Sequence, residues 1–304
     1  MQTRRHFLTT SLGAGAALAA GVQPSAAQKR IIVDSQIHIW KAESPDFPWI
    51  PGVKPQLPEP FTYERALKLM DEAGVHRAVI VPAGLSWSNS YALEAAKRHP
   101  DRFAVMGRMR LDDPKNAELL PNWKKQPGML GVRQTINSPK LVEQAMAADW
   151  FWSGAEKAGL PVMFFASGQV AAFDKIAARH PGLTLIIDHL GLNGAIAKKG
   201  QSAEAIGQVV ALAKYPNVSV KMSNLPGSSL EPYPFPDLTP HLQRVFEAYG
   251  PQRCYWGTDV TNGLARVDWK QRLTHFTEAL KFMSESDKDW VLGRAIMQRL
   301  NWKA

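Results

Sequence analysis

From residue 30 onward, short apolar runs rich in β-branched residues alternate with longer segments of helical periodicity. The alternation repeats about eight times and constrains the fold more than any other feature of the chain. We predict strands at residues 31–35, 77–81, 103–107, 130–135, 161–165, 184–188, 218–221 and 254–257. We predict helices between them at residues 63–73, 90–98, 114–125, 140–158, 170–179, 203–214, 238–249 and 269–283, and a last helix at 287–300.

Strands that alternate with helices form parallel sheets. The chain has 304 residues, and its 45% hydrophobic content is enough to bury one large core. About eight such units match an α/β fold of the closed (β/α)₈ TIM-barrel type, which typically takes ~250 residues. An open doubly wound sheet often carries a glycine-rich phosphate turn after its first strand, whereas Gln36, His38 and Trp40 follow here. We therefore predict one (β/α)₈ barrel domain over residues 28–304.

Residues 1–27 read as a targeting segment rather than as part of the fold. Arg4 and Arg5 precede a short apolar stretch of small residues, and Ser25-Ala26-Ala27 is typical of a cleavage site. The apolar stretch is shorter than the ~20 residues that a membrane span needs. The arrangement resembles a twin-arginine export signal, which implies the twin-arginine export machinery and a bacterial periplasmic or secreted protein.

The formal net charge is +9, but basic residues are dispersed along the chain. A nucleic-acid-binding protein concentrates its charge in a stripe or patch, so this class is disfavoured. A net positive charge is compatible with an anionic small-molecule substrate. The single cysteine, Cys254, lies in an apolar run and excludes an intramolecular disulfide.

Basic residues followed by a proline end several of the predicted helices. His99 and His180 occupy two of these ends, directly before Pro100 and Pro181. Positive charge suits a helix C-terminus and proline stops a helix, so we predict structural roles for both histidines.

Polar and titratable residues gather where the predicted strands end. Barrel enzymes place their chemistry at this carboxyl-terminal face. Two long proline-rich segments, 42–60 and 226–240, are predicted to form loops over the barrel mouth. The candidates at the strand ends are Gln36, His38, Trp40, Arg133, Phe165, His189, Lys221, Asn224 and Asp259.

Each candidate also has a structural alternative. His38 lies between two isoleucines and suits a core position, while Asp259 suits a helix N-cap. Alternation along a strand puts Asp188 and His189 on opposite sides, so we expect only one of them to point inward. Arg133 and Lys221 suit surface positions, but a cation pointing into the barrel needs an anion, which a substrate carboxylate would supply.

The same residues carry a family resemblance. The segment VDSQIHIW at 33–40 resembles the D-x-H-x-H-x-W opening of the amidohydrolase-related barrel family. LGVR at 130–133, IDHLG at 187–191, VKMS at 220–223 and WGTD at 256–259 are similar to its later motifs, in the same order. The resemblance implies a hydrolase of the lactonase branch, whose members open sugar lactones, pyrone dicarboxylate lactones or muconolactones. The superfamily also contains metal-dependent amidohydrolases and decarboxylases.

One departure from the family pattern bears on the cofactor. Gln36 replaces the first histidine of the H-x-H pair, and the fifth strand ends without a histidine. Zinc sites use three protein ligands, of which His38, His189 and Asp259 could be a set, but glutamine is a poor zinc ligand. We therefore favour a site without a metal, although a single Zn²⁺ or other divalent ion stays open because folded export is often used by cofactor-loaded proteins.

The resulting hypothesis is that Asp259 activates a water molecule for attack on a lactone or ester carbonyl. Gln36, His38 and His189 would donate hydrogen bonds to the developing oxyanion. Arg133, Lys221 and Asn224 would bind the substrate, with Trp40 and Phe165 forming an apolar wall. No G-x-S-x-G motif indicates a serine nucleophile.

Two other functions stay open at this point. The first is a metal-dependent amidohydrolase or decarboxylase, and the second is a periplasmic binding protein with reduced catalysis. A homo-oligomer is also compatible with the fold, because such barrels often associate through their outer helices.

Overall fold

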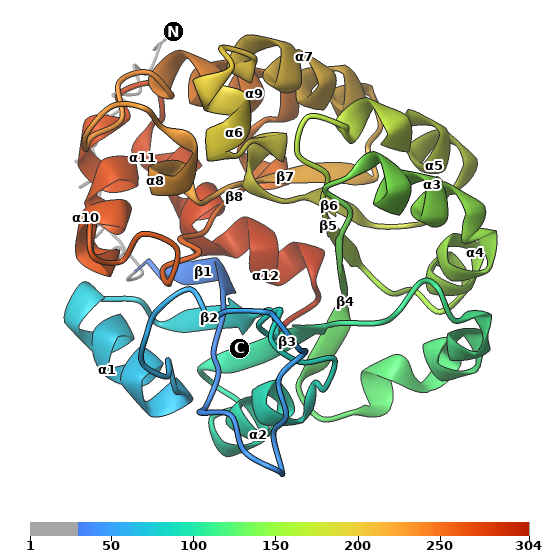
Figure 1. The fold of residues 1–304 in the computed structure, drawn as a ribbon. Helices are drawn as coiled ribbons and strands as arrows, with labels where there is room; N and C mark the ends of the chain where they lie inside the picture. The colour runs from blue at the N-terminus through green and yellow to red at the C-terminus, as the bar shows by residue number, and fades with distance from the viewer. Residues whose placement is uncertain (1–29, 304) are drawn as a thin grey trace, which may run out of the picture.

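The computed structural model describes residues 30–303, and its centre is a barrel of eight parallel strands surrounded by helices (Figure 1). Each strand pairs with the next one in the sequence, from β1 to β8. The gap between β8 and β1 is bridged by a 2.9 Å hydrogen bond from the Asp259 amide to the Gln36 carbonyl. The strands are β1 (Val33–Ile37), β2 (Arg77–Ile80), β3 (Phe103–Gly107), β4 (Met129–Thr135), β5 (Val162–Phe165), β6 (Leu185–Ile187), β7 (Val218–Met222) and β8 (Cys254–Trp256). The predicted (β/α)₈ barrel is confirmed, with strand boundaries shifted by two residues at most.

The helices lie between the strands, as predicted, but several are shorter than expected. The α-helices are α1 (Tyr63–Ala73), α2 (Ser90–Arg98), α3 (Pro139–Ala147), α4 (Asp149–Lys157), α5 (Asp174–Arg179), α6 (Gly194–Lys198), α7 (Ser202–Ala211), α8 (Leu225–Ser228), α9 (Thr239–Tyr249), α10 (Trp269–Thr274), α11 (Glu285–Asp289) and α12 (Ala295–Arg299). Irregular helical segments are η1 (Pro114–Lys125), η2 (Val170–Phe173), η3 (His189–Gly191), η4 (Leu212–Lys214), η5 (Pro251–Arg253), η6 (His275–Ala279) and η7 (Trp290–Arg294).

The helix expected over 287–300 is divided in two by η7, and packing against the barrel explains the break. A Cβ atom at Gly293 would lie 2.2 Å from the Ile31 carbonyl oxygen, so only glycine allows this close approach. The segment expected at 140–158 is likewise two helices, α3 and α4, which meet at Ala148. His99 and His180 occupy helix C-cap positions, which confirms their structural role.

The interior of the barrel is apolar at the amino-terminal ends of the strands. Alternate strand residues such as Val33, Val79 and Met163 form one buried cluster with Ile296 and Leu300 of the C-terminal segment. The last residues of the chain therefore close this end of the barrel, and only the carboxyl-terminal end is left for a substrate. Among the described residues, no helix has the length and apolarity that a membrane span requires. The predicted targeting segment, 1–27, lies outside the described residues.

The loop over residues 42–60 runs across the carboxyl-terminal end of the barrel beside β2 and β3 (blue in Figure 1). Its Ile50 amide donates a 2.6 Å hydrogen bond to Leu85 in the loop that follows β2. The second proline-rich segment begins with α8 and continues to Leu238. Both loops contribute to the cavities at the barrel mouth, through Gln56 and Gly227, in agreement with the prediction.

His275 is a buried histidine of η6 that makes the stability of the protein sensitive to acid. It is fully buried among the rings of Tyr233, Phe235 and Phe276, and neither ring nitrogen has a hydrogen-bond partner within residues 30–303. Burial lowers the pKa of His275 to about 4. Because the unfolded chain binds this proton near pH 6.5, stability is lost as the pH falls from about 6.5 to 4. We expect His275→Phe to flatten the fall of Tm over this range by a few degrees, measured by calorimetry. An unchanged pH slope would contradict this role.

Candidate active site

The predicted site residues come together at the carboxyl-terminal ends of the strands. An open cavity of about 350 Å³ lies at this end of the barrel. Gln36 and Lys221 lie below it, inside the barrel, and Trp40 lines an adjacent cavity with His38 and residues of the 42–60 loop. The candidates that line the main cavity are His38, Arg133, Phe165, His189, Asn224 and Asp259.

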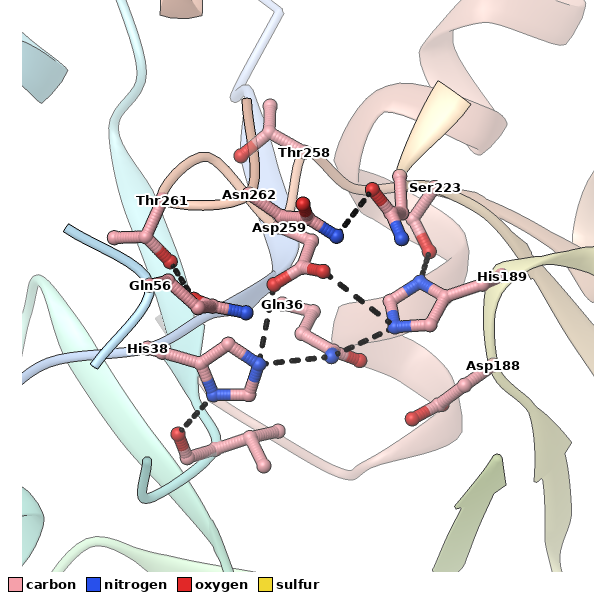
Figure 2. Close-up of polar contacts among 12 residues, drawn as sticks. Gln36, His38, Gln56, Asp188, His189, Ser223, Thr258, Asp259, Thr261 and Asn262 are labelled. Carbon is pink, nitrogen blue, oxygen red and sulfur yellow. Dashed lines mark hydrogen bonds and ion pairs between the residues drawn. The ribbon is translucent and has the colours of Figure 1, made fainter. Parts of the chain in front are cut away.

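Asp259 and His38 form an ion pair at the base of this cavity (Figure 2). His38 Nε2 lies 3.1 Å from Asp259 Oδ1, and His38 Nδ1 donates a 2.8 Å hydrogen bond to the Val81 carbonyl. Burial works to raise the pKa of Asp259, but the charge and hydrogen bond of His38 outweigh it and bring this pKa to about 2. Asp259 is therefore a carboxylate at neutral pH, and its exposed fraction is only 3%.

Gln36 links the two histidines to a buried lysine. Lys221 Nζ donates a short hydrogen bond to Gln36 Oε1, and because an ammonium group only donates, the amide NH₂ must face the histidines. Gln36 Nε2 lies 3.1 Å from His189 Nε2 and 3.4 Å from His38 Nε2. When His38 carries a proton on Nε2 for its ion pair with Asp259, this nitrogen and the Gln36 amide are both donors, so the 3.4 Å contact between them is not a hydrogen bond. The Gln36 amide then donates to His189 Nε2 at 3.1 Å.

These contacts determine the protonation of His189. Its Nε2 accepts from Gln36, so its proton is on Nδ1, which lies 2.8 Å from Ser223 Oγ and donates to it. Burial lowers the pKa of His189 to about 4, so the ring is neutral at neutral pH. The ring of Phe165 contacts it edge to face, 5.1 Å between centroids. The neutral His189 therefore has no free N–H for an oxyanion, which differs from the hypothesis based on the sequence.

Asp188 is a member of the site that the sequence analysis did not select. Its carboxylate lies 2.6 Å from Lys221 Nζ and 3.0 Å from Arg133 Nε, and both Asp188 and Lys221 have 0% exposure. Burial works to raise the pKa of Asp188, whereas the charges of Lys221 and Arg133 hold it below its usual value. The anion expected for these two cations is thus provided by the protein. Lys221 is fully engaged by Asp188 and Gln36, so it supports the site from below.

The alternation expected for Asp188 and His189 was wrong because β6 ends at Ile187. His189 has a φ of 55°, in the left-handed region, so the chain turns and both side chains face the site. Asn224 and Asp259 also lie in this region, at 55° and 51°. Such conformations are costly for residues other than glycine and are found preferentially at functional sites.

The Asp259 turn is held from two sides. Asp34 of β1 is fully buried and accepts hydrogen bonds from the Thr258 amide and hydroxyl. Arg272 of α10 donates to the carbonyl oxygens of Thr258 at 2.8 Å and Asn262 at 2.9 Å. The left-handed backbone at Asp259 is therefore fixed by buried hydrogen bonds, which is how a strained position is maintained.

Carboxamide side chains form much of the cavity rim. Asn224 Oδ1 accepts a 3.0 Å hydrogen bond from Asn262 Nδ2, and Gln56 Oε1 accepts one from Thr261. Asn137 and Asn193 also line the cavity. Each carboxamide offers both donors and acceptors, so this rim suits a ligand with several hydroxyl or carbonyl groups.

The donor set of the site does not fit a divalent metal ion. His38, His189 and Asp259 have the right ligand types, but the Gln36 NH₂ group lies within 3.4 Å of both histidine Nε2 atoms. An N–H donor cannot ligate a cation, and the Lys221 charge on the other side of the amide would repel one. Among residues 30–303, no group of three or more His, Cys, Asp or Glu residues is arranged to hold a metal.

Comparison with known proteins agrees with the fold and the site motifs. The model of the amidohydrolase family matches residues 33–295, which span every strand of the barrel. The chain belongs to the amidohydrolase family. It is a hydrolase of this family, as the sequence motifs predicted.

Individual relatives are more distant. The L-fucono-1,5-lactonase of Burkholderia multivorans (strain ATCC 17616 / 249) is 25% identical over 242 residues, which cover 75% of this chain and 81% of the relative. An amidohydrolase structure from Burkholderia multivorans with bound zinc has a TM-score of 0.76 at 19% identity, covering 89% of this chain and 99% of that one. A protein from Pseudomonas putida assigned as a 2-pyrone-4,6-dicarboxylic acid hydrolase has a TM-score of 0.71 at 19% identity, covering 91% and 100%.

Proposed function

We propose that this protein hydrolyses the lactone, or a similar ester, of a small carboxylated or sugar acid. The observation that carries the proposal is Asp259, a buried carboxylate held ionised at the base of an open cavity. It is the ionised acid that lines the cavity and pairs with His38, whereas Asp188 is occupied by two cations. Asp259 is therefore the group best placed to orient and deprotonate a water molecule.

The proposed reaction follows from these contacts. A water hydrogen-bonded to Asp259 attacks the carbonyl carbon, and Asp259 takes its proton as the new C–O bond forms. Protonation of Asp259 releases the His38 Nε2–H, which donates to the oxyanion. Collapse of the tetrahedral intermediate breaks the ring C–O bond, and the Asp259 proton passes to the leaving alkoxide. The product is a hydroxy acid, which ionises and releases one proton to solution.

The lining of the cavity supports the substrate class. The carboxamide rim suits hydroxyl groups, and the Phe165 ring gives an apolar wall beside His189. Arg133 lines the cavity and donates through Nε to Asp188 and through Nη1 to Thr135, so its Nη2 group is left for a substrate carboxylate. Relatives described as a fuconolactonase and a pyrone dicarboxylic acid hydrolase act on lactones of these two kinds.

We propose that the reaction needs no metal, because the Gln36 amide directs its N–H donors at both histidines and Lys221 lies behind this amide. The zinc bound to one structural relative motivates the opposite proposal, a metal-dependent hydrolase or decarboxylase. Measured metal content therefore distinguishes the two.

The experiment is a lactone screen followed by proton release at constant pH, with the purified protein assayed untreated, with chelator and with added zinc. We expect turnover of a carboxylated or sugar lactone at an equal rate in all three samples. Loss of turnover with chelator and its return with zinc would contradict the metal-free reaction. Release of CO₂ from an aromatic carboxylate would identify a decarboxylase, and ligand binding without turnover would identify a binding protein.

We propose export by the twin-arginine route for the segment 1–27, with the barrel acting in the periplasm or outside the cell. A fusion of residues 1–30 to a reporter, exported only when the twin-arginine machinery is intact, tests this; lysine at both Arg4 and Arg5 should retain the reporter in the cytoplasm. Association into a homo-oligomer is testable by sedimentation.

A further inference from the structure

Arg108 is a second cation, bonded to the loop after β2 that contributes Gly84 to the cavity lining. It follows β3 directly, is partly buried, and forms no ion pair with a carboxylate in the part of the chain that the structure describes. Its Nη1 donates to the Ala83 carbonyl at 3.3 Å and the Ser86 carbonyl at 2.7 Å. Its Nε and Nη2 groups have no hydrogen-bond partner among residues 30–303, so three N–H donors are unused.

Two neighbours fix the orientation of this guanidinium. The ring of Trp87 lies 4.4 Å from Arg108 Cζ, and Asn89 brackets its backbone, accepting from the Arg108 amide at 2.8 Å and donating to its carbonyl at 3.0 Å. A side chain held by stacking and by two carbonyl contacts is preorganised for a further ligand.

Arg108 lies on the same side of the mouth as Arg133. Gly84, within the turn that Arg108 holds through Ala83 and Ser86, lines the cavity together with Arg133. Burial lowers the pKa of Arg108 to about 10, and repulsion from the Arg133 charge makes a smaller contribution. A partly buried cation without a counter-ion is unfavourable until an anion joins it.

The charge balance around the cavity points the same way. Arg108, Arg133 and Lys221 give three positive charges, against the two carboxylates Asp188 and Asp259. Arg108 and Arg133 follow or lie on the neighbouring strands β3 and β4, and of these two cations Arg133 is paired with Asp188.

We propose that Arg108 and Arg133 together form an anion subsite that binds a carboxylate of the substrate at a distance from the scissile carbonyl. The proposal rests on the proposed lactone hydrolysis and makes its substrate class narrower: a lactone carrying a free carboxylate. The free Nη2 group of each arginine donates to this carboxylate, and the ring of Trp87 holds Arg108 in place. Lys221, which the sequence analysis assigned to this task, is excluded from it by its full burial against Asp188.

Malonate binding to the full protein, measured calorimetrically in a chloride buffer, tests the subsite without requiring turnover. We expect Arg108→Met to raise the Kd for malonate about 10-fold or more, with Arg108→Lys intermediate because it restores the charge. Arg110→Met is the matched control: Arg110 also lies near the Trp87 ring, at 5.7 Å, but it is exposed and paired with Asp112 at 2.8 Å. Its Kd should equal that of the wild type.

The outcomes separate the subsite from the proposed function. Malonate binding that is equal in Arg108→Met and the wild type would overturn the subsite, even if the wild type hydrolyses lactones. Arg108-dependent malonate binding in a protein that hydrolyses no lactone would support the subsite and contradict the function. If Arg108 only supported the Ala83–Ser86 turn, Arg108→Lys would bind malonate as weakly as Arg108→Met, which would also overturn the proposal. If Arg108→Met does not fold, Arg108→Lys against Arg110→Lys gives the same comparison.

Discussion

Asp259→Asn lowers kcat for lactone hydrolysis by about 10³-fold, because the amide cannot take the proton of the attacking water. The fold is retained, since the Asp259 backbone amide still donates to Gln36 and Arg272 still holds the turn. KM changes little, as the substrate contacts come from Arg133 and the carboxamide rim. Steady-state kinetics by proton release, with circular dichroism of the same sample, gives both results.

Asp259→Asn also lowers the stability of the folded protein at neutral pH, because it removes the ionised partner of His38. The pKa of Asp259 in the folded state is about 2, below its value in the unfolded chain, so its ion pair contributes stability above about pH 4. This contribution, on the order of 2 kcal/mol, is lost as the pH falls toward 2.

Asp268→Asn is a suitable control, because Asp268 caps α10 and asparagine caps equally well. Activity in Asp259→Asn within 10-fold of the wild type would contradict the base assignment.

Lys221→Met lowers the free energy of unfolding by several kcal/mol, because it leaves the buried Asp188 carboxylate with Arg133 alone. Breaking a buried ion pair by removing one partner typically costs about 3–5 kcal/mol. Chemical denaturation at neutral pH measures the loss. Lys288→Met provides the matched control: Lys288 is also buried, but its ion pair is with an exposed glutamate, away from the barrel mouth.

The double variant Lys221→Met/Asp188→Asn separates stability from activity. It removes the charges of Lys221 and Asp188 and leaves only Arg133, which lines the open cavity, so we expect it to recover part of the lost stability. Activity should stay at least about 10-fold below the wild type, because the Gln36 amide has lost the ammonium group that orients it toward His189. Recovery of both properties in the double variant would show that Lys221 only balances the charge of Asp188.

The barrel was predictable from the sequence because each strand is a short apolar run and each helix has its own periodicity. The candidates at the strand ends were predictable for the same reason, since parallel strands bring their carboxyl ends to one face. Asp188 was missed because the strand ends one residue earlier than the pattern indicates, and the left-handed turn at His189 cannot be read from residue types. Arg108 was missed although it directly follows a predicted strand, because only the structure shows that no carboxylate within residues 30–303 pairs with it.

Roles within the site depend on hydrogen-bond direction, which sequence patterns do not specify. No residue pattern indicates that Lys221 orients Gln36, and so none indicates that His189 accepts rather than donates at Nε2. The replacement of the family histidine by Gln36 was visible in the sequence. The structure shows its physical consequence, which is that an amide directs its N–H donors at the two histidines.

The Gln36 amide stands where a metal-dependent site would need an open position. The most direct measurement is the metal content of catalytically active protein, by elemental analysis of the sample whose turnover number is determined. We expect full turnover with less than about 0.1 equivalent of zinc or any other divalent transition metal, a stoichiometry far below the one ion that a zinc site requires. Close to one equivalent of bound metal, with turnover proportional to it, would show that the reaction depends on a metal.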